Sequence, residues 1–123
     1  MAVKILAVED EEDYRALLEH VLREAGFEVV TAPNGEEGLE AYAAESPDLV
    51  LLDVNLPDMD GMEICRKIRA EGPRKDTPIL FCTIRSAVGR VAEGLKSGGT
   101  DYVVKPFQVE DLLQRVNKAL EKD

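Results

Sequence analysis

Short apolar runs alternate with amphipathic stretches along the whole chain. The apolar runs have the length of strands, and we expect strands at residues 3–8, 27–31, 48–52, 79–82 and 102–104. Because residues 49–52 are apolar without any alternation, the third strand is expected at the centre of a sheet that is covered by helices on both faces.

Between these runs, apolar residues recur at the spacing of amphipathic helices. Gly26 ends the first of five expected helices, Asn34 caps the second with Glu37 in the capping-box position, and the third begins near Gly61. The expected inner faces are, in chain order, Tyr14, Leu17, Leu18, Val21, Leu22 and Ala25; Leu39, Tyr42 and Ala43; Ile64, Cys65 and Ile68; Val88, Val91, Ala92 and Leu95; and Val109, Leu112, Leu113, Val116 and Leu120. Alternating strands and helices predict an α/β fold with a parallel sheet, and five such units occupy residues 1–123 as one domain.

The amino-acid composition limits the kinds of molecule that the domain is expected to bind. Twenty-five acidic and fifteen basic residues give a net charge of −10, so the domain should repel nucleic acid and anionic membranes, whereas a cation or a basic protein surface suits it. The sequence has neither an apolar run of roughly 20 residues nor an export leader. Cys65 and Cys82 stand on apolar positions outside any metal-binding pattern, which favours structural thiols and a reducing, cytoplasmic setting.

Polar residues follow the apolar runs at positions suited to chemistry. Glu9 and Asp10 follow the first run, Asp53 the third, Thr83 the fourth and Lys105 the fifth. In an open parallel sheet, ligands bind outside the carboxyl ends of the strands, where the strand order reverses. We therefore expect three carboxylates, a hydroxyl and an ammonium to converge on one crevice.

The three acids need a compensating positive charge. At about 4 Å and an effective dielectric constant near 20, each pair of carboxylates costs roughly 4 kcal/mol before relaxation. Proton uptake by one of them is one remedy, and a hard cation such as Mg²⁺, which binds one or two carboxylates together with phosphate oxygens, is the other. The next acids, Glu11 to Asp13, are explained by the dipole of the first helix.

Carboxylates, a metal ion, a hydroxyl and an ammonium around one pocket indicate phosphoryl transfer to an aspartate. Asp53 is the expected nucleophile, because a carboxylate can form an acyl phosphate. Mg²⁺, Lys105 and Thr83 would neutralise the charge on the equatorial oxygens of the transferring group.

On these residues the chain resembles the receiver domain of two-component response regulators. The matching segments are KILAVEDE at residues 4–11, LLDVNLPDMDG at 51–61 and DYVVKPF at 101–107. The resemblance implies a flavodoxin-like, doubly wound fold: a five-stranded parallel sheet of order 2-1-3-4-5 with helices on both faces.

The same resemblance implies the following roles. Asp53 would receive a phosphoryl group from a sensor histidine kinase or a phosphotransfer protein. Asp10, Asp53 and the main-chain carbonyl of Asn55 would coordinate Mg²⁺, with Glu9 acting nearby through water.

Thr83 and Tyr102 would form a switch pair that changes the surface of the fourth helix, fifth strand and fifth helix. That surface would control a downstream protein or an output domain. A regulatory module of this kind catalyses only its own phosphorylation and dephosphorylation, and we expect a monomer or a weak phosphorylation-dependent dimer.

Two positions differ from the common receiver pattern. Glu9 replaces the more frequent first aspartate. Ile84 stands where receivers usually carry Ala, Gly or Ser, and its branched side chain is expected to crowd the phosphate site and slow phosphorylation by small donors, phosphoryl loss, or both. Asn55 and Arg85 occupy positions that tune autodephosphorylation in such domains.

Two other functions compete with this interpretation. A pseudo-receiver would act by protein contact without phosphorylation, and only Ile84 favours it. A phosphatase of the haloacid dehalogenase type would need a second aspartate two residues after the nucleophile, where this chain has Asn55.

Overall fold

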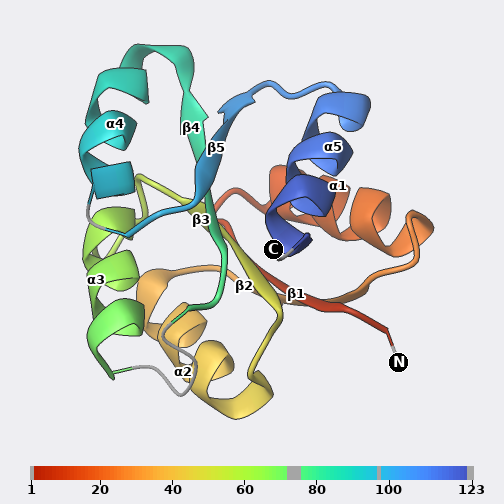
Figure 1. The fold of residues 1–123 in the computed structure, drawn as a ribbon, viewed down its shortest axis with the longest axis horizontal. Helices are drawn as coiled ribbons and strands as arrows, with labels where there is room; N and C mark the ends of the chain where they lie inside the picture. Colours follow the sequence, from red (N-terminus) through yellow and green to blue (C-terminus); the bar gives the residue numbers. More distant parts are fainter. Residues whose placement is uncertain (1, 72–75, 97, 122–123) are drawn as a thin grey trace.

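A computed structural model of the chain describes residues 2–71, 76–96 and 98–121. Strands and helices alternate from end to end (Figure 1). In chain order the elements are β1 (Lys4–Val8), α1 (Glu12–Glu24), β2 (Glu28–Ala32), α2 (Gly35–Glu45), β3 (Leu49–Asp53), α3 (Gly61–Glu71), β4 (Ile79–Ile84), a short 3₁₀ turn (Arg85–Ala87), α4 (Val88–Lys96), β5 (Asp101–Lys105) and α5 (Val109–Leu120). All strand pairs are parallel, and the sheet order is β2-β1-β3-β4-β5, which confirms the predicted fold.

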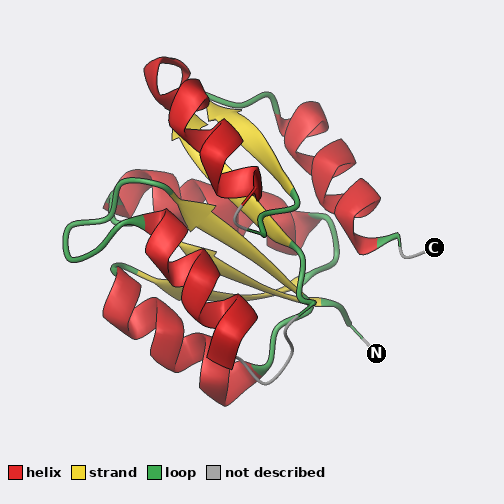
Figure 2. Ribbon diagram, turned by 60° about the vertical axis from the view of Figure 1, so that its left-hand side comes forward, coloured by secondary structure: helices red, strands yellow, loops and turns green. Residues whose placement is uncertain are grey.

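Helices cover both faces of the sheet (Figure 2). Alternate residues of β1 show why: Ile5 and Ala7 pack into one buried cluster with residues of α1 and α5, whereas Leu6 and Val8 pack into the other with residues of α2, α3 and α4. A strand that is buried on both faces has no polar side to show to water, so residues 5–8 of β1 are apolar without alternation.

The expected elements are confirmed, with ends that differ by one or two residues. Thr83 and Ile84 belong to β4, and Lys105 belongs to β5. The predicted cap of α2 is also present: the side chain of Asn34 accepts a hydrogen bond from the backbone N–H of Glu37 at 2.8 Å.

Five residues expected on inner helix faces are instead exposed: Leu17, Ala25, Ala43, Ala92 and Val109. Helix α2 shows the reason. It buries Gly35 against Met59 and Ile64 and turns Gly38 toward the sheet, where a β carbon would lie 2.9 Å from Cγ2 of Val8. Because the glycines define the buried stripe, Ala43 falls outside it.

Both cysteines are free and buried, as the sequence predicted. Burial raises the pKa of the Cys65 thiol above its usual range and that of Cys82 to about 12. Among the described residues, no helix has the length and apolar content that crossing a bilayer requires.

Candidate functional site

The three predicted acids meet at the carboxyl edge of the sheet. β1 and β3 are neighbours, with Val8 opposite Leu52, so the residues that follow them lie side by side. Glu9, Asp10 and Asp53 each offer one carboxylate oxygen, and these atoms all lie within 4.8 Å of one another. Glu9 and Asp53 are only 1% and 6% exposed, whereas Asp10 faces solvent.

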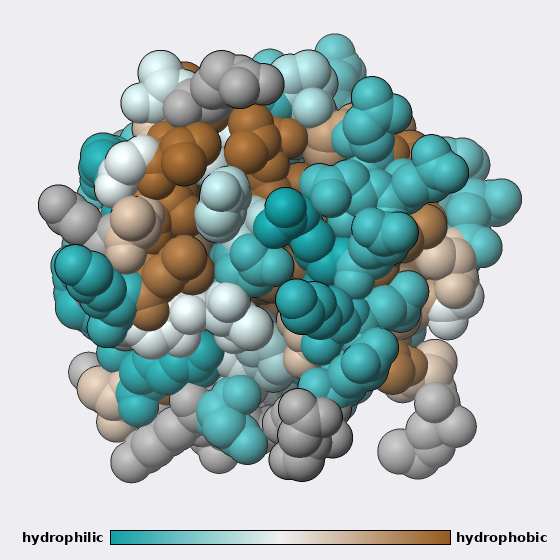
Figure 3. Space-filling view, turned by 45° about the horizontal axis from the view of Figure 1, so that its top comes forward, coloured by the Kyte–Doolittle hydropathy of each residue, from teal (hydrophilic) through white to brown (hydrophobic). Residues whose placement is uncertain are grey.

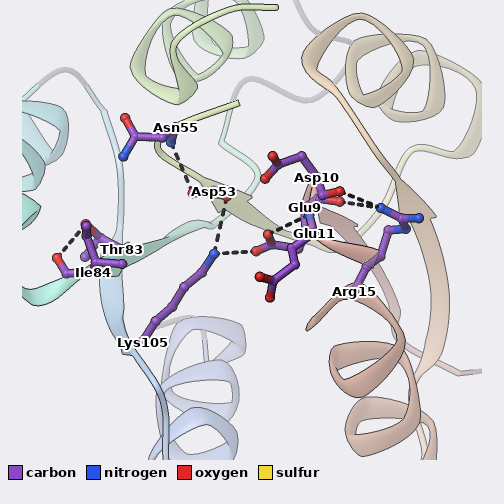
Figure 4. A network of polar contacts seen from close by, with 9 residues as sticks. All are labelled: Glu9, Asp10, Glu11, Arg15, Asp53, Asn55, Thr83, Ile84 and Lys105. Atoms are coloured by element: carbon purple, nitrogen blue, oxygen red, sulfur yellow. Dashed lines mark hydrogen bonds and ion pairs between the residues drawn. The ribbon is translucent and has the colours of Figure 1, made fainter. Parts of the chain in front are cut away.

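Lys105 brings a positive charge to this cluster from the end of β5 (Figure 4). Its Nζ donates hydrogen bonds to Oε1 of Glu9 at 2.6 Å and to Oδ2 of Asp53 at 3.3 Å. One ammonium therefore serves two buried carboxylates, and a third carboxylate lies beside them with no ion pair among the described residues.

Burial controls the protonation of these groups. Loss of solvation raises the pKa of both Glu9 and Asp53 above the ordinary carboxyl values, and the nearby Lys105 only partly opposes that effect. Burial alone would lower the pKa of Lys105, but its hydrogen bond to Glu9 and the charges of both acids outweigh it and raise that pKa. The lysine therefore stays charged, and within the part of the chain that the structure describes it is the one cation in contact with two buried acidic groups.

A shallow pocket of about 370 Å³ opens above the cluster. The three acids and Lys105 line it together with Tyr14 and Ile84. Ile84 is 50% exposed, so the branched side chain that the sequence singled out does stand at the pocket. Figure 3 shows the molecule with the top of Figure 1 turned toward the viewer. On this face, hydrophilic residues cover a broad area beside a group of hydrophobic residues.

The predicted switch residues lie further from the carboxylates. Thr83 is buried at the end of β4, and its hydroxyl donates a 3.2 Å hydrogen bond to the carbonyl of Ile84, not to Asp53 (Figure 4). Tyr102 is half-buried and packs against the cluster under α4, while the Arg115 guanidinium lies 5.5 Å from the centre of its ring. Both residues are near the expected output surface, and among the described hydrogen bonds none joins either of them to Asp53.

Asn55 joins the site to α4. Its backbone N–H donates to Oδ1 of Asp53 at 3.1 Å, and its side-chain oxygen accepts from Nη1 of Arg90 at 3.2 Å. Arg90 also forms an ion pair with Asp60. The sequence contained no local signal for this contact, because 35 residues separate Arg90 from Asn55. The side chain of Arg85, a predicted tuning residue, lies outside the described part of the chain.

The loop between β3 and α3 is held by caps and by a close backbone approach. The Asp58 carboxylate accepts hydrogen bonds from the N–H groups of Gly35 and Glu36, at 2.7 and 2.9 Å, so it caps α2 from across the fold. A β carbon at Gly61 would collide with the carbonyl oxygen of Asp53. Only glycine lets α3 start this close to the end of β3.

Tyr14 is a further member of the site that sequence reasoning placed only in the core. Its ring centre lies 4.7 Å from Nζ of Lys105 and 5.4 Å from the ring centre of Phe107. The helical spacing of apolar residues in α1 gave no hint of this contact, because the partners come from the other end of the chain.

Comparisons with known proteins agree with this geometry. Residues 5–117 match the family model described as the response regulator receiver domain. Response regulator MprA of Mycolicibacterium vanbaalenii is 41% identical over 122 residues, which cover 99% of this chain and 52% of that protein. The probable transcriptional regulator ycf27 of Pyropia yezoensis is 43% identical over 119 residues, 97% of this chain and 48% of the relative. The chain thus spans about half the length of the curated relatives it matches.

Solved structures give the same result. A crystal structure of a putative response regulator from Chloroflexus aurantiacus has a TM-score of 0.94 and 35% identity, and the match covers 99% of this chain and 100% of that one. The chemotaxis response regulator CheY4 of Vibrio cholerae has a TM-score of 0.90 and 36% identity, with 97% and 99% of the two chains covered.

Proposed function

The chain belongs to the response regulator receiver domain family, and from this premise we propose that Asp53 accepts a phosphoryl group from a sensor histidine kinase or a phosphotransfer protein in a Mg²⁺-dependent reaction. The observation that carries the proposal is the position of Lys105. Its ammonium contacts Asp53 and Glu9 at once, within a cluster that also includes Asp10.

The residues present fit a magnesium ion. Asp10, Asp53 and the main-chain carbonyl of Asn55 are the proposed ligands, with Glu9 acting through water. Three carboxylates near one ammonium leave excess negative charge, and oxygen ligands of this kind suit Mg²⁺. When bound, the ion would neutralise charge on the oxygens of the transferring phosphoryl group.

The proposed transfer needs little rearrangement of the chain. A carboxylate oxygen of Asp53 forms the new P–O bond as the P–N bond to the donor histidine breaks, and the electron pair of that bond stays on the ring nitrogen. Lys105 then turns from the Asp53 carboxylate to a phosphoryl oxygen while it keeps its hydrogen bond to Glu9. Electrostatic stabilisation of this kind supplies most of the catalysis of phosphoryl transfer.

Thr83 and Tyr102 are the proposed switch. To reach a phosphoryl oxygen, the Thr83 hydroxyl must leave the carbonyl of Ile84, and this movement frees space for the half-buried Tyr102 ring to turn inward. The surface of α4, β5 and α5 would then change and act on a downstream protein or an output domain. The greater length of the curated relatives supports an output domain on the same chain.

Other elements of the proposal follow from the family. Ile84, Asn55 and Arg85 would tune access to the phosphoryl group and its lifetime. The domain would work in the cytoplasm, without direct contact with nucleic acid or membrane, as a monomer or a weak phosphorylation-dependent dimer. It would be regulatory and would catalyse only its own modification. The pseudo-receiver alternative has little support, because the acids and Lys105 are in contact.

Intact-mass spectrometry tests the proposal. The chain is incubated with Mg²⁺ and acetyl phosphate, or with a cognate kinase, beside Asp53→Asn and the control Glu12→Gln, which changes an exposed acid at the start of α1. We expect a mass increase of one phosphoryl group in the wild type and the control, none in Asp53→Asn, and none when Mg²⁺ is chelated. If no donor produces the adduct in the wild type, the result favours the pseudo-receiver alternative instead.

A further inference from the structure

Tyr14 lies where α1 meets the lysine of the site. It occupies the first turn of that helix, lines the pocket, and contacts both Lys105, the last residue of β5, and Phe107, two residues further on. Nζ of Lys105 is 4.7 Å from its ring centre, and the ring of Phe107 packs against it at 5.4 Å with an interplanar angle of 45°. Phe107 thereby supports the ring that faces Lys105.

The contact between Lys105 and the ring is of a kind that strengthens with burial. A cation over an aromatic face gains about 0.5–1 kcal/mol at exposed sites and about 2 kcal/mol when water is excluded. The Lys105 side chain is only 17% exposed, which places it toward the stronger end of that range. A lysine ammonium on a flexible four-carbon stem needs such contacts to stay in one place.

The ring differs from the other two partners of Lys105. Asp53 changes its charge and shape on phosphorylation, and Glu9 lies beside the metal site. The ring of Tyr14 neither changes its charge nor lies beside the metal site, so phosphorylation of Asp53 would leave its contact with Lys105 in place. It offers no hydrogen-bond acceptor that competes with a phosphoryl oxygen for the ammonium.

The hydroxyl of Tyr14 contributes little to this contact. It is buried, and among the described residues no hydrogen bond of ordinary geometry reaches it. Burial also raises the pKa of Tyr14 to about 12, so the phenol is neutral at physiological pH. A phenylalanine at this position would present the same ring to Lys105.

We propose that Tyr14 is a positioning residue, whose ring holds the Lys105 ammonium where the phosphoryl group arrives. The inference rests on the proposed role of Asp53 as acceptor, and it adds a requirement for an aromatic ring at position 14. It also assigns a task to the first turn of α1 beyond packing on the sheet.

The test compares Tyr14→Leu, which keeps an apolar side chain, with Tyr14→Phe, which keeps the ring. Phosphorylation by acetyl phosphate with saturating Mg²⁺ is followed by intact mass. We expect Tyr14→Leu to react roughly three- to tenfold more slowly, the rate equivalent of losing a partly buried cation–π contact, and Tyr14→Phe to stay within about twofold of wild type. Leu17→Ala, an exposed change on α1, is the matched control.

Tyr14→Leu is also made in the Lys105→Met variant, in order to separate a positioning role of Tyr14 from general damage to the fold. In Lys105→Met the ring has no ammonium to hold, so Tyr14→Leu should leave the residual rate unchanged. A ring-current shift of the Lys105 side-chain protons, seen by NMR in the wild type and Tyr14→Phe, should disappear in Tyr14→Leu.

The outcomes are distinct. If the wild type is phosphorylated and Tyr14→Leu reacts as fast, or slows equally in the Lys105→Met background, the positioning role is wrong and the proposed function stands. If the wild type takes no phosphoryl group from any donor, the proposed function fails, and the role of Tyr14 fails with it.

Discussion

Lys105 is held more closely by Glu9 than by Asp53. Its Nζ lies 2.6 Å from the Glu9 carboxylate and 3.3 Å from that of Asp53. The lysine therefore keeps its contact with Glu9 when Asp53 is modified or replaced, so a change at the proposed acceptor leaves this buried cation paired. The longer glutamate, which departs from the common receiver pattern, performs this task here.

Asp53→Asn should stabilise the domain when no divalent cation is present. It removes one of three clustered carboxylates while Lys105 stays paired with Glu9. We expect the free energy of unfolding at pH 7 to rise by on the order of 1 kcal/mol, since contacting like charges cost up to about 4 kcal/mol before relaxation. For a domain of this size the melting temperature rises by roughly 4 °C.

The pH dependence follows from the raised pKa of Asp53. A carboxyl whose pKa is higher in the folded state contributes stability below its unfolded pKa of about 4 and loses it as the pH rises through the folded value. The advantage of Asp53→Asn should therefore vanish as the pH falls toward about 4. Thermal melts across that range check the prediction, and an Asn variant that is less stable at pH 7 would contradict it.

Ile84→Ala should open the pocket. The side chain is half-exposed at the pocket, so truncation removes bulk there with little loss of buried surface. We expect phosphorylation by acetyl phosphate, phosphoryl loss, or both to accelerate by about three- to tenfold, which corresponds to roughly 1 kcal/mol off the barrier. Unchanged rates for both steps, measured by intact mass, would show that Ile84 does not obstruct the site.

Asp58→Ala should weaken α2 although the mutated residue lies in another loop. It removes the acceptor for the N–H groups of Gly35 and Glu36, and the melting temperature should fall by a few degrees, as with other helix caps. These hydrogen bonds lower the pKa of Asp58, so its contribution is complete above its unfolded pKa of about 4 and is lost as the pH falls through the lower folded value. The exposed acid Glu63, changed to alanine, is the control.

Arg90→Gln should disconnect α4 from the loop between β3 and α3. Because Arg90 and Asp60 are exposed, we expect a stability loss below about 1 kcal/mol. The larger effect should be on the coupling between the acidic cluster and α4. The backbone chemical-shift changes of α4 during a Mg²⁺ titration should be smaller than in the wild type. If α4 responds equally in both proteins, Asn55 and Arg90 do not transmit the change.

Residue order along the strands predicted the sheet, the convergence of the acids and the reach of Lys105 to Asp53. These follow from where strands end, which is a local property of the sequence. The contacts from Asp58 to α2, from Arg90 to Asn55 and from Tyr14 to Lys105 were not predicted. Each joins residues far apart in the chain, and their pairing depends on how side chains fill space after the sheet has formed.

The two buried thiols have a practical consequence. Cys65 and Cys82 are covered and resist ionisation, so neither should react with a maleimide while the domain is folded. A single cysteine engineered on the outer side of α4 could carry a fluorophore in the otherwise native sequence, and the movement of that helix could then be followed in real time.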